Sequence, residues 1–324
     1  MKKIVLISFA IFIAFSVLFI SGCKKQEKTQ EKTIIGISKI VAHPALDAVE
    51  QGIQDELAEQ GFTDIEYDLQ NANGEITTAA SIATKFKSTG VTVAVGIATP
   101  TAQALINSLK DIPVVYSAVT DPVAAGMISS FDKGEKGVAG VSDLTPVKEQ
   151  IMMLQRITGL KSLGHIYSSG EANAVILAEM AEKACAELGI EFVVSTVTNS
   201  SEVKQAAQAI ISKVDGIYVS TDNTVVSALA SLADVAMKAG VPIMSADPSS
   251  TEGSDVLIAW GFDYYKVGRA TGRVVADILN GKSTEDMPTV FMTDPSDINL
   301  IINVDVAEKL GITIPADLLE IANK

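Results

Sequence analysis

The sequence predicts an α/β fold in which a doubly wound parallel sheet occurs twice. Along most of the 324 residues, short runs of β-branched residues alternate with Ala-rich segments, joined by a few turn residues. Residues 91–97 are apolar at nearly every position, which is typical of a parallel strand covered by helices on both faces. Residues 76–88 instead carry apolar side chains at the spacing of one helix face. The alternation runs through two series of strands, so we expect two lobes of ordinary size.

The predicted elements follow in order along the chain. The strands of the first series are 34–40, 65–69, 91–97, 113–117 and 137–141, and those of the second are 162–167, 191–195, 216–220, 242–246 and 256–260. The helices are 45–60, 76–88, 100–108, 122–128, 147–157, 172–187, 200–212, 224–239, 265–280 and 304–310. Gly140, Thr145 and Pro146 interrupt the strand pattern, and Pro146 can open the next helix, so we place the seam between the lobes near residues 142–146. The last strands and the helix 304–310 are left over after both series, which suggests that the chain crosses back between the lobes.

The first 23 residues have the pattern of a bacterial lipoprotein signal. Lys2 and Lys3 precede an apolar run over residues 4–20, and small residues then lead to Cys23. We therefore expect a signal peptide over residues 1–22, cleavage before Cys23 and attachment of lipid to its sulfur. Residues 23–33 would be the lipidated cysteine and a flexible tether, because 24–32 contain no apolar side chain. The alternative is an uncleaved anchor helix. In both cases the protein works outside the cytoplasm, at a bacterial membrane, in the periplasm or on the outer face.

The charge balance excludes several classes of partner and site. The chain has 25 Lys and Arg against 39 Asp and Glu, a net charge of −14; without residues 1–22, which include Lys2 and Lys3, 23 against 39 leaves −16. Such a surface repels nucleic acid. With two histidines and no Cys/His cluster, we expect neither a metal site nor a cofactor. Cys185 is expected to be a small core residue.

Polar loops after the predicted strands form the candidate binding site. In an open parallel sheet, ligands bind outside the carboxyl ends of the strands, where loops lead into helix N-termini. The same residue types also cap helices, as Thr99 before Pro100 and Asp121 before Pro122 would, so capping and ligand contact are alternatives for each of them. The predicted ligand-binding residues are His43, Asn71, Thr99, Thr101, Ser117, Asp121, Glu171, Asn173, Thr221, Asp222, Asn223 and Asp247.

Several of these loops carry motifs of a known family. They are HPALD at 43–47, QNANG at 70–74, IATPTAQA at 97–104, VTDPVAAG at 119–126, GVSD at 140–143, GEAN at 170–173, TDNTVV at 221–226 and GFDYYKVGR at 261–269. In order and spacing they resemble the ABC-transporter substrate-binding family that includes tryptophan- and phenylalanine-binding lipoproteins. The resemblance covers about residues 34–316. It breaks at residues 245–254, in a loop expected to face the ligand, which leaves the ligand's identity open.

The resemblance implies a type I periplasmic-binding-protein fold. Two Rossmann-like lobes would be joined by three hinge crossings, near residues 142–145, 261–264 and 291–294, and would close on a ligand held between them. The N-terminal lobe would comprise residues 34–143 and about 262–292, and the C-terminal lobe residues 144–261 and about 293–324.

An amino-acid ligand needs donors for its carboxylate and a negative charge for its ammonium group. The turn from Thr99 to Thr101 offers hydroxyls and a helix N-terminus for the carboxylate. Asp222 is the first candidate for the ammonium group and Asp121 the second, whereas His43 either packs against the ligand's side chain or contacts solvent. Aromatic residues make up only 5% of the chain, so an aliphatic amino acid or another small amphoteric solute stays open beside an aromatic one.

Two other functions fit parts of the sequence. A secreted hydrolase could use paired carboxylates in the cleft, but the sequence has neither a Gly-x-Ser-x-Gly turn nor a Gly-rich phosphate loop, so we expect no enzyme. A solute-sensing lipoprotein would signal through a partner. The leading prediction is a lipid-anchored solute-binding protein of an ABC importer. It would capture a small molecule, an amino acid, and deliver it to a permease and its ATPase.

Overall fold

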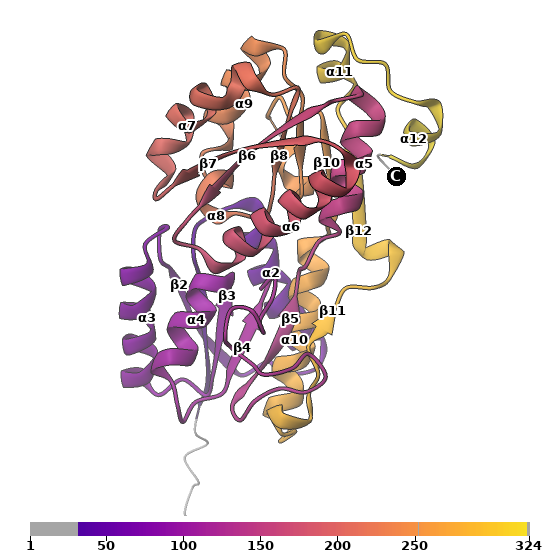
Figure 1. The fold of residues 1–324 in the computed structure, drawn as a ribbon. Coiled ribbons are helices and arrows are strands. Elements are labelled where there is room, and N and C mark those ends of the chain that lie inside the picture. Colours follow the sequence, from indigo (N-terminus) through magenta and orange to yellow (C-terminus); the bar gives the residue numbers. More distant parts are fainter. Residues whose placement is uncertain (1–31, 252, 323–324) are drawn as a thin grey trace, which may run out of the picture. The chain divides into compact units, whose positions relative to one another are not determined.

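The computed structural model describes residues 32–251 and 253–322 (Figure 1). The predicted signal peptide, Cys23 and most of the predicted tether lie outside the described residues, so they stay predictions. Within the described part of the chain, no helix combines the length and the apolar character that spanning a bilayer requires.

Two six-stranded sheets form two lobes, which confirms the predicted doubly wound α/β fold. The strand order is β11-β5-β4-β3-β1-β2 in the N-terminal lobe and β12-β10-β9-β8-β6-β7 in the C-terminal lobe. Neighbouring strands are parallel except β10 and β12, which are antiparallel. The first sheet comprises β1 (Thr33–Lys39), β2 (Ile65–Asn71), β3 (Val93–Ile97), β4 (Val114–Ser117), β5 (Val138–Ser142) and β11 (Val290–Phe291). The second comprises β6 (Ser162–Ser168), β7 (Glu191–Val197), β8 (Gly216–Val219), β9 (Ile243–Ser245), β10 (Ile258–Phe262) and β12 (Ile298–Ile302).

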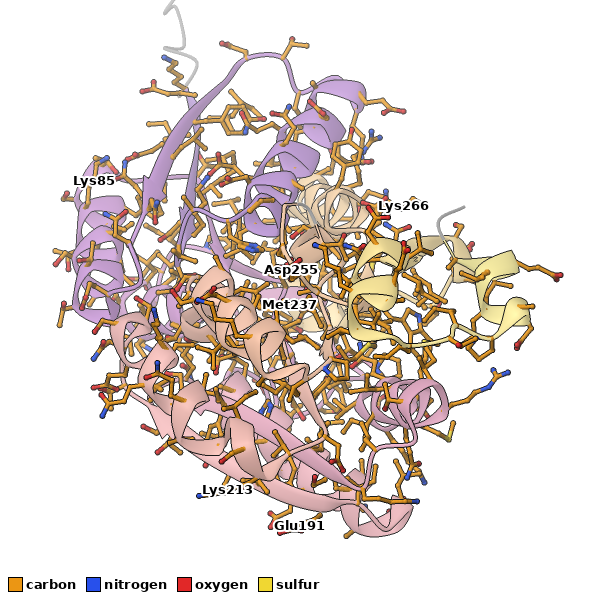
Figure 2. All side chains as sticks on the ribbon, turned by 90° about the horizontal axis from the view of Figure 1, so that it is seen from above. Lys85, Glu191, Lys213, Met237, Asp255 and Lys266 are labelled. Atoms are coloured by element: carbon orange, nitrogen blue, oxygen red, sulfur yellow. The ribbon has the colours of Figure 1, made fainter. Side chains whose placement is uncertain are left out.

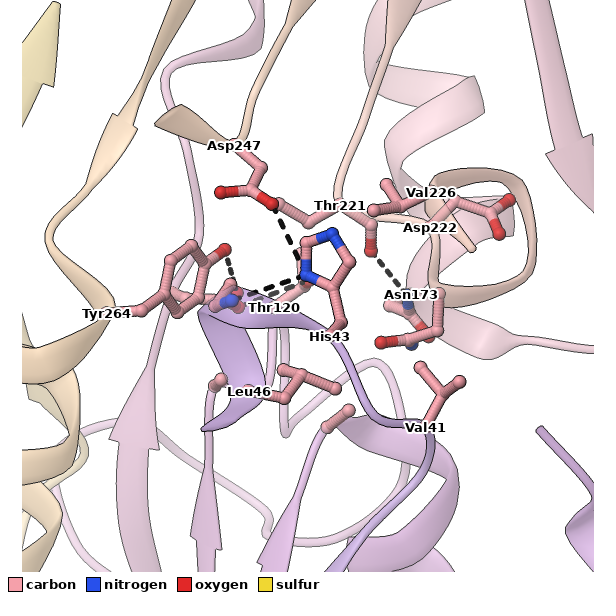
Figure 3. A pocket seen from close by; sticks show the side chains of 15 residues that line it. Val41, His43, Leu46, Thr120, Asn173, Thr221, Asp222, Val226, Asp247 and Tyr264 are labelled. Carbon is pink, nitrogen blue, oxygen red and sulfur yellow. Dashed lines mark hydrogen bonds and ion pairs between the residues drawn. The ribbon is translucent and has the colours of Figure 1, made fainter. Parts of the chain in front are cut away.

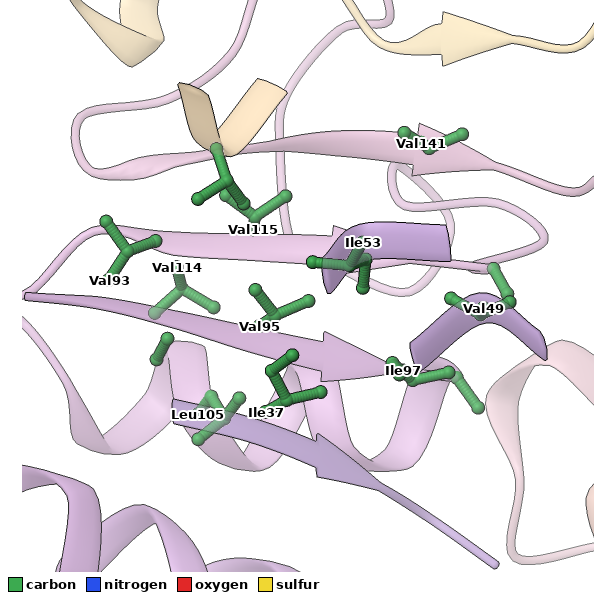
Figure 4. Close-up of a cluster of buried hydrophobic side chains, with 14 of the residues drawn as sticks. Ile37, Val49, Ile53, Val93, Val95, Ile97, Leu105, Val114, Val115 and Val141 are labelled. Atoms are coloured by element: carbon green, nitrogen blue, oxygen red, sulfur yellow. The ribbon is translucent and has the colours of Figure 1, made fainter. Parts of the chain in front are cut away.

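Helices cover both sheets (Figure 1). Those of the N-terminal lobe are α2 (Pro44–Glu59), α3 (Ile76–Thr89), α4 (Thr99–Ser108) and α10 (Tyr264–Leu279). Those of the C-terminal lobe are α5 (Val147–Thr158), α6 (Ala172–Leu188), α7 (Val203–Ile210), α8 (Asn223–Val226), α9 (Leu229–Ala239), α11 (Val304–Leu310) and α12 (Ala316–Ile321). Every residue of β3 is buried, as its continuous apolar sequence predicts, and its valines pack with Ile37 and Ile53 (Figure 4). Charged side chains such as Lys85, Glu191 and Lys213 lie at the periphery (Figure 2).

The chain passes between the lobes three times, as the resemblance implied. The first passage joins β5 to α5, the second β10 to α10, and the third β11 to β12. Hydrogen bonds tie these passages to one another: the Tyr264 hydroxyl donates to Asp143 Oδ2 (3.0 Å), and the Asp263 N–H donates to the Asp297 carbonyl (2.8 Å). The three passages therefore form one connected hinge region, which is where a rotation of the lobes would be absorbed.

Some predicted elements were wrong. Residues 122–128 form turns, not a helix, because Asp121 Oδ1 accepts the N–H groups of Val123 and Ala124 and Gly126 then takes a left-handed φ of 71°. The predicted helix 224–239 is divided into α8 and α9 at Ala228, whose ψ of 14° is not helical. The sequence analysis expected further strands after the second series but gave no bounds for β11 and β12, and it missed α12. β11 has two residues, too short to show a periodic pattern, and β12 is a half-exposed edge strand.

Candidate ligand-binding site

A pocket lies between the two lobes, where the carboxyl ends of their strands meet (Figure 3). It contains about 450 Å³ of space not filled by protein atoms, part of it open to solvent. Its wall is formed by Val41, His43, Ala45, Leu46, Ala98, Ala118, Thr120, Asp143 and Tyr264 on the side of the N-terminal lobe, and by Asn173, Thr221, Asp222, Asn223, Val226 and Asp247 of the C-terminal lobe.

The N-terminal ends of four long helices meet at this pocket. His43 caps α2, its Nδ1 accepting the Ala45 N–H at 3.3 Å, and Ala98 immediately precedes α4. Asn173 is the second residue of α6, and Tyr264 is the first of α10. Helix N-termini present unpaired N–H groups and the positive end of the helix dipole. The backbone of the pocket therefore favours a negatively charged group of a ligand.

Two alanines of the pocket wall have a backbone conformation that L-residues rarely adopt. Ala98, directly after β3, has φ 75° and ψ 156°, and Ala118, directly after β4, has φ 51°. Each such residue costs about 1–3 kcal/mol and persists where the surrounding structure holds it, which is common at functional sites. Here the Ala98 N–H is held by the Ser117 carbonyl at 2.9 Å. The strained turn places the start of α4 directly at the pocket.

Several buried polar atoms at one end of the pocket have no hydrogen-bond partner within the described chain. They are Asn173 Oδ1 and Thr221 Oγ1 in the wall, with Thr99 Oγ1 at the first residue of α4. Asn173, 3% exposed, donates from Nδ2 to the Thr221 carbonyl at 2.9 Å, which fixes its amide and leaves Oδ1 unpaired. Leaving a buried acceptor or hydroxyl unpaired costs about 1–3 kcal/mol. A polar ligand group that pairs with these atoms removes that cost.

Asp222 lies at the same end of the pocket and is fully buried. Its carboxyl accepts the N–H of Ser168 (2.6 Å) and, as the cap of α8, the N–H of Val225 (3.0 Å). Burial, together with the nearby charge of Glu171, raises the pKa of Asp222 to about 7. Glu171 is held behind it by the Asn223 amide (2.6 Å) and the Thr224 hydroxyl (2.6 Å).

Asp143 and Asp247 form a second acidic group at the other end of the pocket. Asp143 accepts the Tyr264 hydroxyl, and burial raises the pKa of Asp143 to about 6. Asp247 accepts the N–H and the hydroxyl of Ser249 (2.9 and 2.8 Å), and burial raises its pKa as well. Across the cleft, His43 Nδ1 lies 3.6 Å from Asp247 Oδ2. The contact joins the start of α2 in one lobe to the loop after β9 in the other.

The chemistry available is that of hydrogen bonds and charge. Over residues 32–251 and 253–322, no three His, Cys, Asp or Glu side chains are grouped as a metal site would require. The wall combines amide, hydroxyl and carboxyl groups with an apolar side that includes Val41, Leu46 and Val226. Such a surface can hold a molecule that is both charged and partly apolar.

Half of the predicted ligand-binding residues line the pocket: His43, Asn173, Thr221, Asp222, Asn223 and Asp247. Thr99 begins α4 beside the wall residue Ala98, and Glu171 lies in a neighbouring groove that also includes Asn223.

The other four have internal partners and no place in the pocket wall. The Thr101 hydroxyl donates to the Ile97 carbonyl (2.6 Å), and the hydroxyls of Ser117 and Thr271 are 2.6 Å apart. Asp121 Oδ1 accepts the N–H of Val123 within the turn that Asp121 begins, and Asn71 Oδ1 accepts the N–H of Asn73 (2.8 Å). The sequence analysis left out Thr120, Asp143 and Tyr264. Asp143 and Tyr264 fall within the predicted crossings 142–145 and 261–264. Their position at a crossing could have identified them as candidates from the sequence.

We expect Asp143→Asn to flatten the pH dependence of stability in the ligand-free protein. The folded-state pKa is raised to about 6, against about 3.9 for a carboxyl in an unfolded chain. The stabilising contribution of the protonated form is therefore complete below about pH 4 and is lost as the pH rises through about 6. From pH 4 to pH 7, the free energy of unfolding measured in urea should fall by about 1–3 kcal/mol more in the wild type than in the variant. Parallel pH profiles of the two proteins would contradict this account of Asp143.

Comparison with known proteins places the chain in a family. A model of ABC transporter substrate binding proteins matches residues 34–324. A tyrosine-binding protein of Clostridioides difficile is 35% identical over 291 residues, covering 89% of this chain and 83% of the relative.

Two solved structures of similar proteins also share the fold of this chain. An ABC domain of Streptococcus pneumoniae in complex with L-Trp is 31% identical, with a TM-score of 0.86 over 90% of this chain and 99% of that one. A ligand-free, open structure of a substrate binding protein with adhesive properties from Clostridium difficile is 34% identical, with a TM-score of 0.67 over 88% of this chain and 97% of that one. On these matches the chain belongs to the family of ABC transporter substrate-binding proteins.

Proposed function

We propose that this protein is an extracytoplasmic lipoprotein that captures an aromatic amino acid between its two lobes and delivers it to an ABC importer. The observation that carries the proposal is a pair of unpaired polar atoms in the pocket wall, Asn173 Oδ1 and Thr221 Oγ1, with Thr99 Oγ1 unpaired beside the wall residue Ala98. The same wall includes the apolar side chains of Val41 and Leu46.

The polar end of the pocket suits the two charged groups of an α-amino acid. The start of α4, with the Thr99 hydroxyl and no side-chain cap, offers donors to a carboxylate. Asn173 Oδ1 and Thr221 Oγ1 are acceptors for an ammonium group, and the Asp222 carboxyl behind them supplies its counter-charge. Burial and the charge of Glu171 raise the pKa of Asp222, and an ammonium group beside it would lower that pKa.

The apolar side of the pocket and the relatives support an aromatic ligand. Val41 and Leu46 lie below His43 in the pocket wall (Figure 3), which also includes Ala45. One relative is a tyrosine-binding protein and another was solved with L-Trp. An aromatic amino acid matches a pocket that is charged at one end and apolar along its side.

The arrangement of the lobes supports capture by closure. Sequence identity is nearly the same for the L-Trp complex and for the ligand-free, open structure, 31% and 34%, yet the TM-scores are 0.86 and 0.67. Divergence in sequence does not account for that difference, whereas a different angle between the lobes would. We infer that the two lobes of this chain are in a closed arrangement, which a ligand bound to both lobes would favour.

We expect the protein to bind an aromatic L-amino acid, and Thr221→Val to weaken that binding by about 1.5–3 kcal/mol, roughly tenfold or more. The variant keeps the shape of the side chain and removes the hydroxyl that would contact a charged group. Isothermal titration with tyrosine, tryptophan, phenylalanine and leucine measures both the preference and the loss.

Thr196→Val is the matched control for this titration, because Thr196 is exposed on β7, away from the pocket wall. Equal affinity of the wild type, Thr221→Val and Thr196→Val would remove Thr221 from the site. The proposed ligand class would be refuted if titration of the folded protein with each of these amino acids gave no heat of binding. A denaturation curve establishes that the protein is folded.

Replacement of Cys23 by alanine should release the folded protein from the membrane. Acyl chains on Cys23 would bury many methylenes, each contributing about 0.8 kcal/mol to membrane attachment, and nothing in residues 24–32 would replace them. The measurement is fractionation of cells that express either form, after a high-salt wash. Retention of Cys23→Ala in the membrane fraction would refute the lipid anchor while leaving the amino-acid site untouched.

A further inference from the structure

We propose that Asp247 is the residue that selects the ligand's side chain, by accepting a hydrogen bond from a neutral donor at its far end. The inference rests on the proposed amino-acid site and adds to it a substrate class: aromatic amino acids whose ring ends in a donor, such as the phenol of tyrosine.

The pocket has two polar ends of different character. Figure 3 shows Asn173 and Asp222 on one side of the His43 ring and Asp247 with Tyr264 on the other. Asn173 and Thr221 carry the unpaired atoms, so that end suits the charged groups of the amino acid. A side chain pointing away from it would pass His43 and end near Asp247.

No hydrogen bond joins the facing atoms of His43 and Asp247. His43 Nδ1 accepts the Ala45 N–H at 3.3 Å, so this nitrogen acts as an acceptor. Asp247 Oδ2, itself an acceptor, lies 3.6 Å from the same nitrogen, beyond hydrogen-bond distance. Two acceptors therefore face each other across the cleft. A donor supplied from a third group, such as a ligand hydroxyl, would satisfy the carboxylate.

Hydrogen bonds within its loop also fix the position of the Asp247 carboxyl group. Its two oxygens accept the N–H and the hydroxyl of Ser249, and each oxygen keeps a second lone pair. The Ser245 hydroxyl accepts the Asp247 N–H (3.2 Å) and donates to the Ser250 hydroxyl (3.0 Å). Gly261 packs so closely on the Ala246 carbonyl that a Cβ there would lie 2.0 Å from it. The loop therefore fixes a carboxylate that is 3% exposed at the pocket wall.

A neutral donor fits this end better than a second cation. The carboxyl groups of Asp143 and Asp247 already receive donors from Tyr264 and Ser249, and the walls leading to them include Ala45, Leu46 and Ala118. An apolar ring with one donor at its tip matches both features. A ring without the donor would leave a buried carboxylate, 3% exposed, with an unmet acceptor.

The test is isothermal titration of the full-length protein with four ligands: L-tyrosine, L-phenylalanine, 4-methoxy-L-phenylalanine and L-lysine. The methoxy compound keeps the ring oxygen but cannot donate. In the wild type, tyrosine should bind about 10- to 100-fold more tightly than phenylalanine or the methoxy compound. In Asp247→Ala that ratio should fall below about threefold. Asp255→Ala is the matched control, since Asp255 pairs with Lys309 at the surface of the same lobe (Figure 2).

The wild-type ratio needs no variant, so the inference can fail even where Asp247→Ala does not fold. Equal binding of tyrosine and phenylalanine would overturn it, as would a ratio that survives in Asp247→Ala, or lysine as the tightest ligand. Each of those outcomes leaves amino-acid capture standing, whereas failure of all four ligands refutes the proposed function itself.

Discussion

Between the two lobes, three carboxyl groups lie buried at one small pocket, those of Asp143, Asp222 and Asp247. Burying an ionised carboxylate is costly unless a cation or hydrogen-bond donors compensate it. Here the compensation comes from hydroxyls, backbone N–H groups and the positive ends of helices, and the pKa of each carboxyl group is raised. The architecture follows from this constraint, because only converging helix N-termini and strand ends place so many donors at one point.

The same constraint connects the pocket to the hinge. Asp143 lies in the first passage between the lobes and Tyr264 in the second, and their hydrogen bond forms part of the pocket wall. Asp263 and Asp297 join the second passage to the third. Under the proposed capture by closure, a ligand that contacts this wall would act directly on the passages between the lobes. Binding would then be linked to closure through a few buried polar contacts, with no longer pathway through the lobes.

The sequence was sufficient for the fold and for part of the site. Alternating apolar strands and amphipathic helices predicted both sheets, and loops after strands predicted Asn173, Thr221 and Asp247 in the pocket wall. It could not separate a ligand contact from an internal one, because Thr101 and Thr221 are alike in sequence context. Only the fold turns the Thr101 hydroxyl to the Ile97 carbonyl and leaves that of Thr221 unpaired. Asp143 and Tyr264, 121 residues apart, meet through tertiary structure that no local pattern encodes.

We propose that an amino acid bridges the two lobes and holds them closed. Small-angle X-ray scattering of one preparation, with and without a ligand that calorimetry shows to be saturating, tests it most directly. A ligand that contacts both lobes shifts the population toward the closed form by its differential affinity. With ligand, we expect a smaller radius of gyration and a scattering curve that fits the two lobes as they are arranged in Figure 1. Identical curves at saturation would contradict closure and leave a rigid binding cleft.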